Sequence, residues 1–400
     1  MEIDRVPAWT PGPLPASSLW PSNSSHARDA DEDARLQYFE PRIAHTLYGT
    51  SGDPVRWHRS STVTLGTLTV LAVEVLRAPP GSGATTGLAV LHIQLGHDPV
   101  GELAGLRDLS SPGSGAANRQ RCQDTLPAGV RIAARARRAT TIGHVTFGSA
   151  APPVMPSAYA AWPAQDQWLW SLASATSSSA FPPDREDVSL FDGRVHFSAD
   201  WQALILRDGV AFVGTSPDPG GGDTFHAAAQ TYVHSIYLDV ILLGRLQADA
   251  LNALANRVAD ISLPRLGAGR LGSLEGQLIE LRRAFGRDHI TVHAKGNEIL
   301  EQYCAQHRMP ELRARLAEDL TDSARYVEVA LARSTNAVMG LVAVLGLPFG
   351  LSYAAGALWG SKGLRGFLVW TAVAGTVSLA MTALGPVRRM LRATGTELDS

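Results

Sequence analysis

The longest apolar stretches of the chain lie near its C-terminus. No charged residue occurs from Ser334 to Ser361, and a second uncharged run extends from Gly366 to Val387. A helix of the 23 residues from Ala337 to Trp359 would be about 34 Å long, against roughly 30 Å of membrane hydrocarbon. The pattern predicts a transmembrane hairpin over residues 336–387 with a short outer turn. The alternative is a pair of helices buried in a protein core.

Basic residues flank these runs unevenly, with more of them before the first run and after the second than in the turn. The residues before the first run and after the second are Arg325, Arg333, Arg388, Arg389 and Arg392, and those in the turn are Lys362 and Arg365. Positive charge is enriched on the cytoplasmic side of membrane proteins. We therefore expect a multi-pass protein of the inner or plasma membrane with both termini in the cytoplasm, including a basic tail over 388–400.

The sequence of the N-terminal half predicts short strands mixed with helices. The segments with β character are Thr62–Val75, Leu88–Leu95, Thr141–Phe147, Val188–Phe197 and Ala203–Val213, the last with a hairpin turn at Arg207-Asp208-Gly209. Helix-compatible stretches are Pro99–Leu109 and Pro127–Arg138, and the serine-rich run Ser171–Ser179 predicts a loop. This predicts a cytoplasmic α/β domain over 36–222, after a disordered proline-rich and acidic arm over 1–35.

The chain then becomes helical. We expect helices over Thr224–Asp260, over Leu274–Gln306, and from Pro310 onward, because proline is well placed at the first helical position. The third helix continues into the first uncharged run as a rod of roughly 50 residues, about 75 Å long, and Pro348 is expected to kink it. The predicted fold class is thus α+β with a membrane part: an α/β domain, a helical stalk over 223–335 and the hairpin.

Composition excludes several function classes. The 35 Lys and Arg and 37 Asp and Glu give a net charge of −2, which argues against binding nucleic acid through overall basicity. The two cysteines, Cys122 and Cys304, are too few for a disulfide framework or a zinc site. His289 and His293 have a spacing that could bind metal but lack a third ligand, so we expect surface histidines. We expect no enzyme, no resident metal and no cofactor.

One local motif resembles a known family. Asn336-Ala337-Val338-Met339 precedes an apolar run that contains a proline, and with the order of elements it is similar to the CorA family of magnesium and metal-ion transporters. The resemblance implies a homo-oligomer, by analogy a pentamer, embedded in a lipid bilayer. It also implies a pore made by the first spans and lined by Asn336, Met339, Gly340 and Gly350.

The chain departs from that family at the outer end of the first span. The family's Gly-Met-Asn triplet falls on Gly360-Ser361-Lys362, and Arg365 follows. A lysine offers only donors and a positive charge, whereas the family's asparagine offers a carbonyl oxygen to a hydrated cation. The resemblance therefore implies an outer mouth formed by Gly360, Ser361, Lys362 and Arg365 with altered selectivity, and leaves the ion open.

Two further functions compete with a CorA-like channel or transporter. One is a membrane-anchored signalling or defence effector whose cytoplasmic domain senses a ligand or partner, with or without a conducting pore. The other is a structural anchor without conductance.

Overall fold

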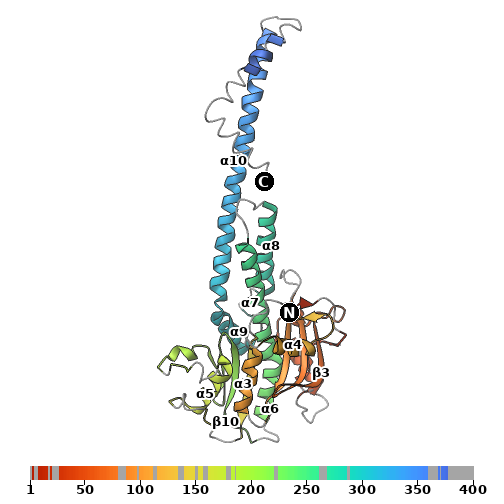
Figure 1. Cartoon of the computed structure of the whole chain (residues 1–400), viewed down its shortest axis with the longest axis vertical. Coiled ribbons are helices and arrows are strands. Elements are labelled where there is room, and N and C mark those ends of the chain that lie inside the picture. The colour runs from red at the N-terminus through yellow and green to blue at the C-terminus, as the bar shows by residue number, and fades with distance from the viewer. Residues whose placement is uncertain are drawn as a thin grey trace. The chain divides into compact units, whose positions relative to one another are not determined.

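The computed structural model describes most of the chain. The described residues are 2–3, 8–16, 19, 27–79, 87–96, 99–110, 115–133, 139–148, 152–155, 161–176, 182–184, 186–219, 224–260, 268–285, 289–358, 368–369 and 371–376. They divide into two compact units, of which the first comprises residues 1–260 and 273–317 and the second residues 261–272 and 318–400. The first unit contains both sheets described below (Figure 1).

The first sheet is antiparallel, with the strand order β2-β3-β4-β5. Its strands are β2 (Thr10–Pro11), β3 (Arg56–Leu65), β4 (Leu68–Arg77) and β5 (Gly87–Gln94). β3 and β4 are joined by a two-residue turn in which Gly66 has a φ of +65°, a conformation that glycine adopts without steric cost. β4 is almost entirely apolar and is buried along most of its length.

The second sheet is mixed, with the order β7-β10-β9-β8. Its strands are β7 (Thr141–Phe147), β8 (Arg194–Ser198), β9 (Trp201–Ile205) and β10 (Gly209–Pro217). β7 pairs with β10 in parallel, and the other neighbours are antiparallel. Helix α5 (Ala164–Ser174) packs on this sheet through a core that includes Trp168, Leu169 and Leu204.

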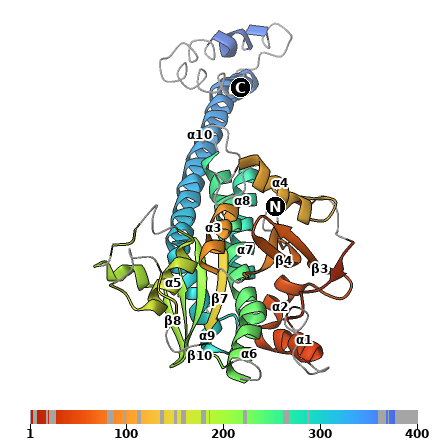
Figure 2. The same cartoon turned by 60° about the horizontal axis from the view of Figure 1, so that its bottom comes forward.

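A continuous helical segment lies between the two sheets in both views (Figures 1 and 2). It consists of α6 (Thr224–Tyr232), a π-helical turn η4 (Val233–Tyr237) and α7 (Leu238–Ala259). Many side chains of α7 are buried, among them Leu243, Leu246 and Leu254, because the helix contacts structure on several sides. Helix α9 (Ala294–Gln306) packs against α7 and β9.

The described residues form further elements. They are β1 (Glu2–Ile3), paired with β6 (Val130–Arg131), the helices α1 (Ala27–Tyr38), α2 (Pro41–Tyr48), α3 (Pro99–Ser110), α4 (Gly115–Thr125) and α8 (Ala268–Phe285), the 3-10 turn η3 (Val188–Phe191), and α10 (Met309–Leu358). α10 is 50 residues long, and the helix extends past Pro348 without an end there.

Our prediction of a membrane part of the fold is corrected by the structure. Among the helices that the structure describes, none combines the length and the apolar character that crossing a membrane requires. The predicted hairpin over 336–387, and with it the multi-pass inner-membrane location with both termini cytoplasmic, is therefore wrong. The prediction was based on the absence of charged residues. Transfer into hydrocarbon is driven by apolar surface, and Gly346, Pro348 and Gly350 of α10 contribute little apolar surface.

Most of the second predicted span and the whole tail 388–400 lie outside the described residues. What the described residues establish is a mixed α/β fold with two four-stranded sheets and many helices.

Several local predictions also need correction. The segment Thr62–Val75 is a hairpin and not one strand, the stretch Pro127–Arg138 contributes β6 rather than a helix among its described residues, and Ser171–Ser174 ends α5. The expected helix over Leu274–Gln306 is divided into α8 and α9. Part of the expected disordered arm is ordered, because β2 pairs with β3 and the side chain of Leu14 is buried.

Candidate functional site

The residues that the resemblance placed along a pore lie on α10 or beyond it. Asn336 and Gly350 are exposed, Gly340 is half-buried, and the side chain of Met339 is 66% exposed. Gly360, Ser361, Lys362 and Arg365, which were predicted to form the outer mouth, lie outside the described residues. The described part of the chain shows no pore that would test these roles, and they stay predictions.

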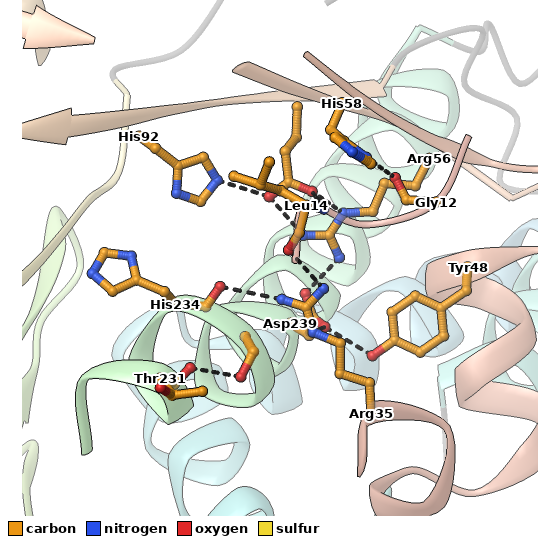
Figure 3. A network of polar contacts seen from close by, with 12 residues as sticks. Gly12, Leu14, Arg35, Tyr48, Arg56, His58, His92, Thr231, His234 and Asp239 are labelled. Atoms are coloured by element: carbon orange, nitrogen blue, oxygen red, sulfur yellow. Dashed lines mark hydrogen bonds and ion pairs between the residues drawn. The ribbon is translucent and has the colours of Figure 1, made fainter. Parts of the chain in front are cut away.

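A closed network of buried charges lies in the first unit instead (Figure 3). Its centre is Arg56, the first residue of β3, whose side chain is fully buried. The guanidinium donates from Nε to Glu74 Oε2 at 2.7 Å and from Nη2 to Glu74 Oε1 at 3.1 Å. This two-bond pairing of arginine with a carboxylate is strong and fixes both side chains in one geometry. Arg56 and Glu74 thereby join two adjacent strands on their buried face.

The third nitrogen of the same guanidinium reaches the helix between the sheets. Arg56 Nη1 donates to Asp239 Oδ1 at 2.5 Å, and the Tyr48 hydroxyl donates to Asp239 Oδ2 at 2.8 Å. Arg35 Nε lies 3.5 Å from the same Oδ2 atom. Asp239 is fully buried in the first turn of α7, so α1, α2 and β3 all converge on one carboxylate.

The N-terminal segment is tied into the network through its backbone. The Leu14 amide donates to Glu74 Oε2 at 2.9 Å, and the Leu14 carbonyl accepts from Arg35 Nη1 at 3.1 Å. Arg35 Nη2 donates to the carbonyl of His234 at 3.2 Å. His234 lies in the π-helical turn η4, where the wider hydrogen-bonding pattern leaves carbonyls available to outside donors. Such turns occur frequently at functional sites.

We call Arg35, Tyr48, Arg56, Glu74 and Asp239 the arginine–carboxylate clasp. Its formal charges cancel, since two guanidiniums face two carboxylates. Burial by itself would raise the pKa of Glu74, but Arg56 and His92 lower it to well below its ordinary value. The pKa of Tyr48 is raised well above its ordinary value, by burial and then by Asp239. At neutral pH Glu74 is therefore ionised and the phenol of Tyr48 is protonated.

The arrangement suits holding elements together better than chemistry on a substrate. The carboxylate oxygens of Glu74 and Asp239 all have donors from within the chain, so none is left to bind or deprotonate a ligand. Within the residues described, no three His, Cys, Asp or Glu side chains are grouped so that they could hold a metal ion. Breaking one partner of a buried pair is costly, typically about 3–5 kcal/mol, so the clasp fixes how α7 sits against the first sheet.

Our sequence reasoning missed the clasp, although a signal was present. Glu74 is the only charge inside the apolar strand Leu68–Leu76, and Asp239 is the only charge between Val233 and Leu243. A single charge within an apolar run is rarely fully buried without a partner. Two such charges therefore indicate buried cations elsewhere in the chain, although they do not identify Arg35 and Arg56.

Comparison with known proteins gives no relative: no protein-family model, no curated protein and no solved structure matches this chain. The similarity to the CorA family consequently stays a prediction based on Asn336 to Pro348, and the candidate function is argued from the geometry alone.

Proposed function

We propose that the protein is a self-assembling signalling protein, in which α10 joins copies of the chain and the domain with the arginine–carboxylate clasp is the sensing part. Signalling is the function that we considered as an alternative to ion transport, and the membrane anchor of that alternative is not proposed again. Ion transport stays a prediction, but it requires the two membrane spans that we expected from the sequence, and the structure contradicts that expectation.

The observation that carries the proposal is the exposure of large apolar side chains along α10. Tyr326, Val329 and Leu331 are 44%, 49% and 53% exposed, and Met339 and Tyr353 are 66% and 77% exposed. At about 100° per residue Leu331, Met339 and Tyr353 lie within about 80° of one another, and Tyr326 and Val329 lie outside that stripe. Large apolar side chains that are exposed in two directions on one helix are normally covered by a partner.

Further copies of α10 are the occupant that fits this pattern. A partner protein with one groove would cover one of these directions, whereas in a closed symmetric bundle each helix contacts a neighbouring copy on either side. The absence of charge from Ser334 to Leu358 removes like-charge repulsion between copies. Exposed glycines at 346 and 350 permit close approach of helices, and the amide of Asn336 can set the register, as single polar residues do in helical bundles.

The test is the mass of the full-length chain in solution, with and without a charge placed on the apolar part of α10. We expect light scattering to give a multiple of the 42.5 kDa chain mass, and Met339→Glu to shift the protein toward the monomer by at least tenfold in dissociation constant. The matched control is Ala314→Glu, which adds the same charge at an exposed position in the first turns of the same helix. A monomeric wild type at tens of micromolar would overturn the proposal.

A further inference from the structure

A small cleft lies among α7, α8 and the first turns of α10, within the first unit. Its volume is about 200 Å³, part of which is open to solvent. Four apolar side chains, none of them more than 6% exposed, form its walls: Leu251 of α7 and Leu278, Leu281 and Phe285 of α8. Residues three and four apart share one face of a helix, so a single face of α8 supplies most of the apolar wall.

The polar side chains that line the cleft offer hydrogen-bond donors. Arg282, near the end of α8, is exposed, and Arg313 of α10 is half-buried. Among the residues that the structure describes, neither guanidinium forms an ion pair with a carboxylate. Gln247 of α7 is buried and its Oε1 atom accepts from Cys304 Sγ at 3.8 Å, while its NH2 group is a donor. The cleft therefore combines an apolar wall with two cationic groups and an amide.

Positive charge prevails beside the cleft. Burial raises the pKa of the nearby Cys304 thiol to about 11, and of the charges around it Arg313, which lowers this pKa, acts more strongly than Glu301, which raises it. Arg282 and Arg313 come from different helices and repel each other, and an anion placed between them replaces repulsion by attraction. The cleft thus matches a ligand that has a hydrocarbon part and one anionic group.

We propose that this cleft binds a small amphiphilic anion, an aliphatic carboxylate of medium chain length, whose hydrocarbon part packs on the apolar wall while Arg282 and Arg313 hold its carboxylate. Arginine suits this role, because its planar fork of donors matches the two oxygens of a carboxylate. The aliphatic stems of the two arginines add apolar surface to the cleft. The amide of Gln247 supplies one more donor.

The size of the cleft limits the ligand. Ligand pockets typically have volumes of roughly 300–1,000 Å³, and this cleft is smaller, so it suits a single short chain and not a two-chain lipid or a nucleotide. Because Arg313 belongs to α10, a bound carboxylate would also join α8 to the helix that we propose for self-assembly. The binding itself goes beyond that proposed function and does not rest on it.

The experiment is isothermal titration calorimetry of the full-length wild type with octanoate at low ionic strength, and with 1-octanol and acetate as probes that each lack one part of the ligand. We expect saturable binding of one octanoate per chain. Both other probes should bind at least tenfold more weakly, because 1-octanol has no charge and acetate has little apolar surface.

Arg282→Gln and Arg313→Gln should each weaken the binding of octanoate at least fivefold, since each removes one charged donor. The matched control is Arg283→Gln, which removes the same charge from an exposed position on the same helix that does not line the cleft. It should change the dissociation constant less than twofold.

Three results would overturn the proposal: no saturable binding of octanoate at millimolar concentration, binding of 1-octanol as tight as that of octanoate, or an unchanged affinity in both arginine variants. The wild type alone decides the first two points, so the test does not depend on the variants folding, and circular dichroism checks the fold of each variant for the third. Light scattering of the same samples separates this proposal from self-assembly, because a monomer that binds octanoate would overturn only the latter.

Discussion

Arg56 and Asp239 are 183 positions apart in the chain, and their side chains meet at 2.5 Å without solvent exposure. One residue begins a strand of the first sheet and the other lies in the first turn of α7. This single ion pair therefore connects the N-terminal sheet to α7, which follows the π-helical turn whose Tyr237 stacks on Phe212 of the second sheet, and the other members of the clasp reinforce it.

Replacing Arg56 by methionine should be among the most destabilising single changes in the first unit. The substitution keeps the bulk of the side chain but leaves Glu74 and Asp239 buried with reduced compensation, and we expect a loss of about 3–5 kcal/mol in the free energy of unfolding. Urea denaturation measures it. The control is Arg77→Met: Arg77 pairs with the exposed Asp53, and such a surface pair contributes at most about 1 kcal/mol. Equal losses would contradict the role of the clasp.

Tyr48→Phe isolates the contribution of one hydrogen bond to the clasp. The variant removes the hydroxyl that donates to Asp239 Oδ2 and changes little else in shape. Because hydrogen bonds to charged groups contribute about 1.5–3 kcal/mol, we expect a loss in that range. In the double variant with Asp239→Asn, the loss in free energy of unfolding should be clearly smaller than the sum of the two single-variant losses, because both substitutions remove the same hydrogen bond. Additive losses would show that the two groups are not coupled.

The stability of the protein should depend on the charge of Glu74 in acid. Its pKa is lowered in the folded state relative to 4.5, so the unfolded chain binds the proton more readily. The stabilisation is present above pH 4.5 and is lost as the pH falls below it, by up to about 1.4 kcal/mol per pH unit. Urea midpoints between pH 4.5 and 3.5 should fall less steeply in Glu74→Gln than in the wild type. Parallel slopes would contradict this.

The two cysteines should react slowly with alkylating reagents in the folded protein. Burial raises the pKa of the Cys304 thiol to about 11, with Arg313 acting in the opposite direction, and burial also raises the pKa of Cys122. Since the thiolate is the reactive form, labelling by iodoacetamide at pH 8 should be at least tenfold slower for Cys304 in the native protein than in urea. Mass spectrometry of the labelled peptides follows each site separately, and rapid native labelling of Cys304 would refute its burial.

The amino-acid sequence determined the elements whose residues carry the pattern locally. The turn at Arg207-Asp208-Gly209 predicts the β9–β10 hairpin that the structure contains, and the bounds of α3 and β7 agree with Pro99–Leu109 and Thr141–Phe147. A proline at position 310 and the lack of another proline before Pro348 predict the long helix α10. In each case nearest neighbours decide the backbone conformation, so periodicity and turn residues are sufficient.

Tertiary structure alone decided the rest. Parallel pairing of β7 with β10 joins Thr141 to Gly209, and no local pattern specifies that choice. The clasp likewise needs Arg35, Arg56, Glu74 and Asp239, from four separate elements, to be buried at one point. Each charge in isolation is unfavourable in the interior and becomes stable only when the others are present. The sequence shows lone charges in apolar runs, but their partners follow only from the packing of distant segments.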